Sequence, residues 1–453
     1  PGVTGGVLTS NKVLNQQANT DGQNVYMAFD AALGDNLELT LKNINVVDNS
    51  TNAFQVDIYN ANGSNVTEYY CYGWNLGNSC MVDLWNLSAG TYSVTVSPYW
   101  GGKVAFDALL TRNTIGPKLA PSVPTDVSVG AGQVKRLTFD ANLGDTVALQ
   151  LNNVSTTPVG GNVTVKIYRP DTGAITPANY YTYIANSGTS TLNLPNLPVG
   201  GTYTVTVEAD YGLPASAQLT VFPGATGAVL NENNVLSQQA NVDGQNVYMT
   251  FNASLGDNLQ LTFNNINVVD TGTNAFQVDI FSANGTNISE FYCYSWTRGN
   301  SCLADLWNLS AGTYSVVVSP YWGGKIGFDA LLTKDTIGPK LTRSVPSDIS
   351  VSAGQVKRLT FDANLGETVA LQLSDVATTP VGGNVTVKIY RPDTGAITPA
   401  SYYTYVSTSS ASTLNLSNLP VGGTYTVTVE ADYGVPAGAQ LTVFPGVTYG
   451  VLT

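Results

Sequence analysis

The nonapeptide PGVTGGVLT, at residues 1–9, sets the architecture of the chain because it returns twice. It reads PGATGAVLN at residues 223–231 and PGVTYGVLT at residues 445–453. Both intervals, from Pro1 to Pro223 and from Pro223 to Pro445, are 222 residues long. A fixed period of this kind is typical of an array of repeated structural units. The sequence therefore predicts two 222-residue repeats followed by the first nine residues of a third.

The first half of each repeat alternates apolar and polar residues in the way that is typical of β-strands. Runs of five to seven residues, broken by Gly, Asn, Asp and Pro, occur at 25–29, 37–41, 54–59, 68–72, 81–85, 92–96 and 104–110. Such runs predict strands, and no ten-residue segment has a convincing helical period. Seven or eight short strands in about 110 residues are typical of an antiparallel β-sandwich.

The second half of each repeat is a diverged copy of the first half. FDAALGDNLELTLKNI at 29–44 matches FDANLGDTVALQLNNV at 139–154, and SAGTYSVTV at 88–96 matches VGGTYTVTV at 199–207. Between the halves, residues 111–126 contain three prolines, which favours a short and stiff connector. We therefore expect an all-β chain of four tandem antiparallel β-sandwiches, of the jelly-roll or immunoglobulin-like kind, in an A-B-A-B order. Their expected bounds are 1–115 (A1), 116–224 (B1), 225–337 (A2) and 338–444 (B2), with 445–453 as the start of a third repeat or a connector strand.

The composition argues against several classes of function. The net charge is −13 without any basic cluster, whereas nucleic-acid binding needs a clustered positive surface. The chain has no histidine, which removes the commonest general base and every Ser-His or Cys-His arrangement. We therefore expect neither an enzyme nor a nucleic-acid partner. No apolar run reaches the roughly 18 residues needed to cross a bilayer, so we expect no membrane-spanning segment.

The four cysteines form two pairs at equivalent places in the repeats, Cys71 with Cys80 and Cys293 with Cys302. A zinc site with four ligands is disfavoured because each sandwich has no histidine and no further cysteine. We expect a disulfide in each pair rather than free thiols. Disulfides of this kind indicate an oxidising location, extracellular or at the cell surface.

Aromatic residues are concentrated in two segments of sandwich A, EYYCYGWNLGNSCMVDLW at 68–85 and SPYWGG at 97–102. Aromatic side chains in surface loops stack on sugars or anchor protein interfaces, whereas alternate ones in strands fill a core. Trp74 and Trp100 stand beside glycines in expected turns, so we expect these two to be exposed. The candidates for a ligand or an interface are Tyr72, Trp74, Tyr99 and Trp100, with their counterparts Tyr294, Trp296, Tyr321 and Trp322.

Carboxylates recur in turns and strands at Asp35, Asp57, Asp83, Asp107, Asp145 and Asp171, and again one period later. Asp57 and Asp83 alternate with apolar neighbours, which predicts outward-facing strand residues. Oxygen-rich loops bind calcium in many extracellular β modules, but no stretch here has the dense spacing of a calcium loop. We expect turn-forming or solvated carboxylates and no metal or other cofactor, with structural calcium as the alternative.

Several short motifs resemble the bacterial pre-peptidase C-terminal (PPC) domain, a jelly-roll-like β-sandwich appended to secreted proteases and found in other surface proteins. In sandwich A the motifs are the aromatic strand 26–29, Gly34-Asp35 before Leu37 and Leu39, 57–59 with Gly63, and Gly90-Thr91-Tyr92 before Val94 and Val96. In sandwich B they are Phe139, Gly144-Asp145, Ile167-Tyr168 with Gly173, and Gly201-Thr202-Tyr203 before Val205 and Val207. The resemblance implies this fold for all four sandwiches. The sequence contains no protease domain, so the resemblance implies no protease-accessory role.

The similarity of the two repeats indicates a demand for length rather than for varied chemistry. The stretch TTPVGGNVTVKIYRPDTGAITPA is unchanged between 156–178 and 378–400. We expect a structural component of an extracellular filament, fibre or surface stalk, which associates with further copies or repeats through covalent joints or strand exchange. Val447, Tyr449 and Val451 alternate as an exchanged strand would, and equally as the first strand of a following covalent repeat. The alternatives are an adhesin or carbohydrate-binding module that uses the Tyr/Trp loops and, more remotely, an accessory region of a secreted hydrolase.

Overall fold

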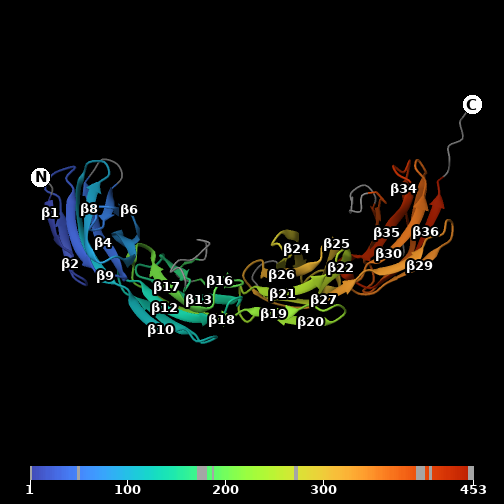
Figure 1. Ribbon diagram of the computed structural model, residues 1–453, viewed down its shortest axis with the longest axis horizontal. Coiled ribbons are helices and arrows are strands. Elements are labelled where there is room, and N and C mark those ends of the chain that lie inside the picture. Colours follow the sequence, from blue (N-terminus) through green and yellow to red (C-terminus); the bar gives the residue numbers. More distant parts are fainter. Residues whose placement is uncertain are drawn as a thin grey trace, which may run out of the picture. The chain divides into compact units, whose positions relative to one another are not determined.

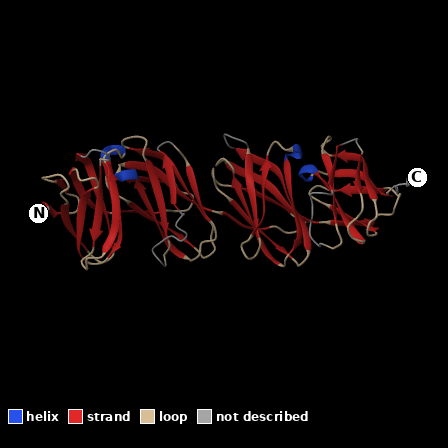
Figure 2. Cartoon of the chain, turned by 90° about the horizontal axis from the view of Figure 1, so that it is seen from above, coloured by secondary structure: helices blue, strands red, loops and turns tan. Residues whose placement is uncertain are grey.

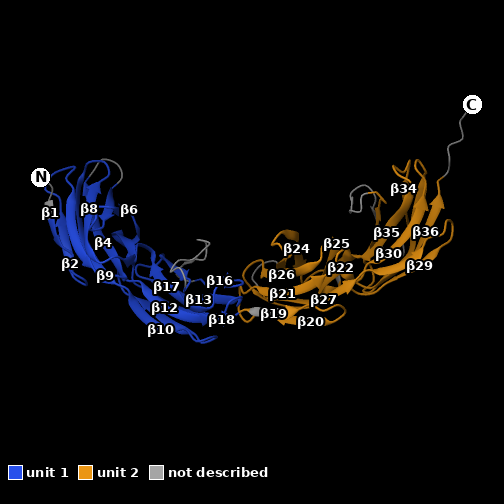
Figure 3. Ribbon diagram, viewed as in Figure 1, with its two compact units in different colours: residues 1–223 blue, residues 224–453 orange. Residues whose placement is uncertain are grey.

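The computed structural model describes residues 3–47, 52–170, 181–185, 188–269, 274–393, 403–407 and 411–446 (Figure 1). The chain divides into two compact units, Pro1–Pro223 (unit 1) and Gly224–Thr453 (unit 2) (Figure 3). The described residues lie in strands and connecting loops, apart from four short 3-10 turns (Figure 2). These turns are η1 (Leu76–Asn78), η2 (Asp210–Gly212), η3 (Arg298–Asn300) and η4 (Asp432–Gly434).

Unit 1 contains two sandwiches, each made of a five-stranded and a four-stranded sheet. In A1 the sheets are β1 (Val3–Val7), β3 (Val25–Ala31), β8 (Gly90–Pro98), β5 (Ala53–Tyr59), β6 (Asn65–Tyr72), and β2 (Val13–Gln17), β9 (Lys103–Arg112), β4 (Asp35–Val47), β7 (Ser79–Leu87). In B1 they are β10 (Thr114–Lys118), β12 (Lys135–Ala141), β17 (Gly201–Ala209), β14 (Asn162–Tyr168), β15 (Tyr181–Ala185), and β11 (Thr125–Val129), β18 (Ala215–Pro223), β13 (Val147–Thr156), β16 (Ser190–Leu194).

Unit 2 repeats both sheet orders. In A2 the sheets are β19 (Ala225–Val229), β21 (Val247–Ala253), β26 (Gly312–Pro320), β23 (Ala275–Phe281), β24 (Asn287–Tyr294), and β20 (Val235–Gln239), β27 (Lys325–Lys334), β22 (Asp257–Val269), β25 (Ser301–Leu309). In B2 they are β28 (Thr336–Lys340), β30 (Lys357–Ala363), β35 (Gly423–Ala431), β32 (Asn384–Tyr390), β33 (Tyr403–Ser407), and β29 (Ser347–Val351), β36 (Ala437–Pro445), β31 (Val369–Thr378), β34 (Ser412–Leu416). The predicted all-β fold of four sandwiches is confirmed.

The first strand of each sandwich differs from the others in its direction. Strand β1 pairs with β3 in parallel, and β10, β19 and β28 pair in the same way with β12, β21 and β30. The remaining strand pairs of the described sheets are antiparallel. The parallel pairing follows from the path of the chain, because β2 crosses to the opposite sheet between β1 and β3.

The proline-rich connector between A1 and B1 is partly a strand. Residues 114–118 form β10, which belongs by its pairing to B1 and begins two residues before the expected boundary at 115/116. Proline lacks the N–H that a central strand needs, and it is therefore confined to edges and bulges. Pro117 satisfies both conditions, because β10 is an edge strand whose register shifts between Ile115 and Lys118.

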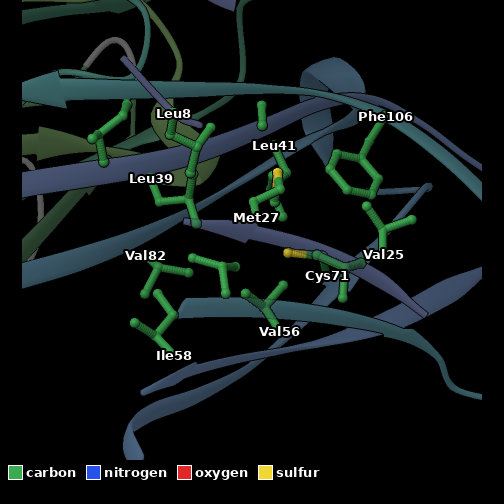
Figure 4. Close-up of a cluster of buried hydrophobic side chains, with 14 of the residues drawn as sticks. Leu8, Val25, Met27, Leu39, Leu41, Val56, Ile58, Cys71, Val82 and Phe106 are labelled. Carbon is green, nitrogen blue, oxygen red and sulfur yellow. The ribbon is translucent and has the colours of Figure 1, made fainter. Parts of the chain in front are cut away.

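A stacked Phe–Tyr pair recurs in the core of every sandwich. In A1, Phe29 on β3 lies directly opposite Tyr92 on β8, with ring centroids 5.2 Å apart, and both rings are buried. The Tyr92 hydroxyl donates to Ser88 O at 3.1 Å, which satisfies its buried polar group. The equivalent pairs are Phe139–Tyr203, Phe251–Tyr314 and Phe361–Tyr425. Leucine, valine and isoleucine side chains from both sheets fill the rest of the A1 core (Figure 4).

Candidate functional site

The aromatic segments of sandwich A1 meet at one end of its five-stranded sheet. Gly73 N, after β6, donates to Asn52 O (2.8 Å), and Tyr99 N, after β8, donates to Ala53 O (3.1 Å). Both acceptors stand at the start of β5, which lies between β6 and β8 in the sheet. The two turns are therefore brought together. We call the side chains gathered there the aromatic surface: Tyr70, Tyr72, Trp74, Tyr99 and Trp100.

The side chains of the aromatic surface contact one another in two groups. Tyr72 stacks on Trp74 with centroids 4.6 Å apart, while Tyr99 makes edge contacts with Tyr70 (5.4 Å) and Trp100 (5.0 Å). Trp74 and Trp100 are each 62% exposed, as their neighbouring glycines predicted. Tyr70 was not among the sequence candidates. The signal for it is the alternation in EYYCY, which puts Tyr70 and Tyr72 on the same face of β6.

Sandwich A2 retains all five aromatic residues and their contacts. Tyr321 lies 5.3 Å from Tyr292 and 5.1 Å from Trp322, and Tyr294 lies 4.8 Å from Trp296, measured between ring centroids. Trp296 and Trp322 are again exposed. The sequence candidates are thus assembled into one surface in each A sandwich, whose ligand or partner remains a prediction.

Both expected disulfides are present. Cys71 on β6 joins Cys80 on β7, and Cys293 on β24 joins Cys302 on β25. Because β6 and β7 belong to different sheets, the bond connects the two layers of the sandwich at their edges. All four cysteines are buried.

Removing one disulfide is expected to destabilise its own A sandwich. The bond closes a loop across nine sequence positions, and constraining a loop of that length in the unfolded chain is worth about 2–3 kcal/mol. Urea unfolding of a Cys71→Ala/Cys80→Ala variant measures this loss in unit 1. The control is the effect of a reducing agent on unit 1, which should destabilise the wild type and leave the variant unchanged. An unfolding free energy equal to that of the oxidised wild type would contradict the prediction.

Several of the expected carboxylates form turns. Asp35 Oδ2 accepts from Ala32 N (2.8 Å) and Asp145 Oδ2 accepts from Asn142 N (2.7 Å). Hydrogen bonding to the Arg112 guanidinium keeps the pKa of Asp35 below its ordinary value. Asp107 accepts from Asn43 Nδ2 at 2.7 Å, and Asp171 lies outside the described residues. Within the described ranges, no three acidic or cysteine side chains gather in a way that would hold a metal ion.

Asp57 and Asp83 are not the solvated residues that their alternation predicted. Asp57 is only 9% exposed, and Gln55 Nε2 donates to it at 3.0 Å. Asp83 lies on the outer face of the four-stranded sheet, but sandwich B1 covers that face, and burial raises the pKa of its carboxyl. Strand alternation identifies which residues point away from their own core. It does not reveal that a second sandwich covers them.

The contact between the sandwiches of unit 1, the A1–B1 junction, is built from tightly fitted loops. Ser79 Oγ donates to Tyr211 O at 2.8 Å, and Thr111 Oγ1 donates to Gly132 O. Gly132 has φ +67°, and a Cβ there would lie 2.4 Å from Thr40 Oγ1, so only glycine fits. The A2–B2 junction of unit 2 repeats these bonds, from Ser301 Oγ to Tyr433 O (2.7 Å) and from Thr333 Oγ1 to Gly354 O (2.6 Å).

An aromatic and cationic stack crosses each junction. Trp85 of A1 stacks on Tyr168 of B1 with centroids 4.5 Å apart and planes within 5°, and Arg136 Cζ lies 3.6 Å from the Trp85 ring centroid. Cation–π contacts of this geometry are favourable, the more so when water is excluded. In unit 2, Trp307 stacks on Tyr390 and Arg358 Cζ lies 3.7 Å from the indole. Sequence reasoning missed this role, because nothing local to Trp85 indicates what lies across the junction.

Charged groups surround the stack in unit 1. Glu38 is fully buried, neither of its carboxyl oxygens has a hydrogen-bond partner, and burial raises its pKa to about 9, with Asp83 adding to the effect. Arg136 is 8% exposed, and its side-chain nitrogens have no hydrogen-bond partner within the described part of the chain. Lys166 and Glu208 form an ion pair at 2.5 Å, and burial raises the pKa of Glu208.

Unit 2 has the same groups with one exchange. Gln260 replaces Glu38, while Asp335 replaces Asn113, so that a carboxyl group has moved from one position to the other. Asp335 forms an ion pair with Arg358 and accepts from Gln260 Nε2. The Asp335 side chain is 5% exposed and that of Arg358 is 9% exposed. The arginine at the A2–B2 junction therefore has a direct carboxylate partner that Arg136 lacks.

The expected connector strand cannot be placed. Val447, Tyr449 and Val451 lie outside the described residues, which end at residue 446. In the described residues, no helix has the length and apolar character needed to cross a membrane.

Comparisons with known proteins identify similar folds. No protein-family model matches the chain, and no curated protein matches it. Among solved structures, the pre-peptidase C-terminal domain of collagenase from Bacillus anthracis is similar at 14% identity and a TM-score of 0.19, over 24% of this chain and 97% of that one.

Two multidomain structures are also similar. The tandem CBM22 domains of Paenibacillus barcinonensis match at 9% identity and a TM-score of 0.17, over 44% of this chain and 82% of that one. Sulfolobus turreted icosahedral virus provides a match at 14% identity and a TM-score of 0.18, over 72% of this chain and 90% of that one. These similarities concern the β-sandwich and jelly-roll fold alone.

Proposed function

We propose that the chain is a structural component of an extracellular filament, fibre or surface stalk, made of A-B units that associate with further copies. The observation that carries this proposal is the A–B junction. Its hydrogen bonds and its Trp–Tyr–Arg stack occur in both units at equivalent residues. The stability of such arrays is roughly a sum of units and neighbour contacts, so a buried junction makes a stiff building block of two sandwiches.

Two further observations support an extracellular structural role without enzymatic activity. The disulfides Cys71–Cys80 and Cys293–Cys302 are of the kind that persists in oxidising compartments. The sequence has no histidine. A protein that provides length and stiffness needs neither a nucleophile nor a general base.

Electron microscopy of the native material, combined with the mass of its polypeptide, tests this function. We expect elongated assemblies whose polypeptide mass is either close to 47.6 kDa, for separate subunits, or much larger, for a continuous array. Short particles that do not polymerise under native conditions would contradict the proposal.

A second candidate function is carbohydrate or surface binding through the aromatic surface. The observation that favours it is the exposure of Trp74, Trp100, Trp296 and Trp322 in clusters with tyrosines. Exposed aromatic rings present flat apolar faces, on which sugar rings stack. The occurrence of the surface in both units would add avidity to a weak individual contact.

If the aromatic surface binds glycans, a Trp100→Ala/Trp322→Ala variant should lose about tenfold or more in affinity, since a central aromatic anchor typically contributes more than 1 kcal/mol. A glycan array probed with the full chain measures this loss. The matched control is Leu33→Ala/Leu255→Ala, which removes equally exposed apolar side chains outside the aromatic surface. Equal binding by both variants, or no bound glycan at all, would rule this function out.

A further inference from the structure

The two junctions differ in how they hold one carboxyl group. Both contain an arginine, a lysine, a tryptophan, a tyrosine and two acidic residues at equivalent positions, Arg136/Arg358, Lys166/Lys388, Trp85/Trp307, Tyr168/Tyr390, Asp83/Asp305 and Glu208/Glu430. The third carboxyl group is Glu38 on β4 in unit 1. In unit 2 it is Asp335, beyond the end of β27, and Gln260 occupies the position of Glu38.

Glu38 is surrounded on every side by elements that exclude water. Asp83 on β7 and Glu208 on β17 face it with like charge, and Arg136 on β12 faces it with opposite charge. Thr111 on β9 lies near the carboxyl group, but its single hydroxyl proton is donated to Gly132 O across the junction. An ionised carboxylate at this site would therefore be desolvated and without hydrogen bonds, which is a costly state.

Gln260 shows what kind of side chain this position accepts. It is fully buried in unit 2, and its Nε2 donates to Asp335 and to Asp305 Oδ1 (3.3 Å). A primary amide is neutral and has nearly the shape of a protonated carboxyl group. Each of the two can donate a hydrogen bond, whereas an ionised carboxylate can only accept. Unit 2 thus contains a permanent neutral counterpart of protonated Glu38.

We propose that the A1–B1 junction closes only with a proton on the Glu38 carboxyl group, so that it loosens as pH rises, while the A2–B2 junction has no such response at the equivalent position. The chain then carries two joints of the same construction with different sensitivity to pH. This inference rests on the proposed role of the junction as a stiffening element, but its test does not depend on filament formation.

The sign of the effect follows from proton binding. Burial raises the pKa of Glu38 from 4.5 to about 9 in the closed junction, and opening returns the group to water. Between these two values the closed form holds one proton more than the open form. The equilibrium constant for opening should therefore rise by about tenfold per pH unit from about pH 5 to pH 9 and level off above. The acids common to both junctions contribute equally to each, so the difference between the junctions isolates Glu38.

Hydrogen exchange of the full chain, followed by mass spectrometry at pH 6, 7 and 8, tests the proposal. The reporters are backbone amides of the junction loops, residues 130–133 and 210–213 in unit 1 and residues 352–355 and 432–435 in unit 2. After correction for the intrinsic pH dependence, protection of the unit 1 loops should fall by about tenfold per pH unit relative to the unit 2 loops. Equal pH dependence of protection in the two units would overturn the proposal.

Two variants provide matched controls within the same chain. Glu38→Gln copies the unit 2 residue and should remove the extra pH dependence of the unit 1 loops. Gln260→Glu/Asp335→Asn copies the unit 1 arrangement and should confer that dependence on the unit 2 loops. Retention of the pH dependence in Glu38→Gln would assign it to another group and overturn the proposal.

A direct titration separates this inference from any change in stability. The chain has seven glutamates, so carboxyl-labelled glutamate gives few resonances in a ¹³C NMR spectrum. The resonance that disappears in Glu38→Gln should titrate well above pH 7 in the wild type. A midpoint at or below the ordinary 4.5 would mean that Glu38 is ionised beside Arg136 and would overturn the proposal.

Discussion

Replacing Asp335 with asparagine should lower the free energy of unfolding of unit 2 by about 3–5 kcal/mol, because it leaves the buried Arg358 guanidinium without its direct counter-charge. Both side chains are more than nine-tenths buried. Asparagine has the same size and keeps an oxygen that accepts from Gln260 Nε2, so the substitution removes little besides the charge. Asp305 remains 3.8 Å from Arg358 Nη2 and places the expected loss towards the lower end of this range.

Urea unfolding of the full chain, followed by hydrogen exchange of peptides from each unit, measures the loss in unit 2 separately from unit 1. The control is Asp393→Asn, which breaks the ion pair between Asp393 and Arg391 on the surface of unit 2. Solvent screens a pair of that kind, so no measurable change is expected. If Asp335→Asn were as harmless as Asp393→Asn, the ion pair with Arg358 would not contribute to the junction.

The substitution Asn113→Asp provides the reciprocal comparison in unit 1. It would give Arg136 the carboxylate partner that Arg358 has, with protonated Glu38 in the place of Gln260 as hydrogen-bond donor. We expect unit 1 to become more stable. A gain in unit 1 together with a loss in unit 2 would establish that the carboxyl group at this position stabilises the junction.

The fold was largely accessible from the sequence because its signals are local. The 222-residue period, the two-residue alternation and the Phe–Tyr pairs of each sandwich specify strands, their inward faces and the number of sandwiches. The parallel first strand was not accessible, because strand direction depends on the path of the chain between sheets. The strand β10 was hidden by Pro117, whose effect on pairing is neutralised by an edge position and a bulge.

The candidate sites were accessible to different degrees for a related reason. The disulfides and the exposed Trp74 and Trp100 follow from spacing and from neighbouring glycines. The junction does not, because Glu38 and Asp83 have the alternation of solvent-facing residues on β4 and β7. Only the packing of B1 against that face makes them buried. The exchange of Glu38 and Asn113 for Gln260 and Asp335 is visible in the sequence, but it acquires meaning only when the four residues are known to line equivalent junctions.

Replacing Trp85 with alanine should lower the free energy of unfolding of unit 1 by about 2–4 kcal/mol, less than a fully buried tryptophan would lose, because its indole is only half buried. The substitution removes the surface on which both Tyr168 and Arg136 rest. Arg136 would then keep its burial without its cation–π contact. Because this stack crosses from A1 to B1, we also expect the two sandwiches to unfold in separate steps.

Hydrogen exchange at increasing urea measures both effects, since peptides of A1 and B1 should lose protection together in the wild type and at different urea concentrations in Trp85→Ala. The matched control is Trp74→Ala in the same sandwich, whose side chain is 62% exposed and touches Tyr72 but not B1. Surface substitutions of that kind usually change stability by less than about 0.5 kcal/mol. Trp307→Ala repeats the experiment in unit 2, where Asp335 still holds Arg358 at the junction. Its loss should therefore be smaller than that of Trp85→Ala, and a larger one would show that the ion pair does not support the stack.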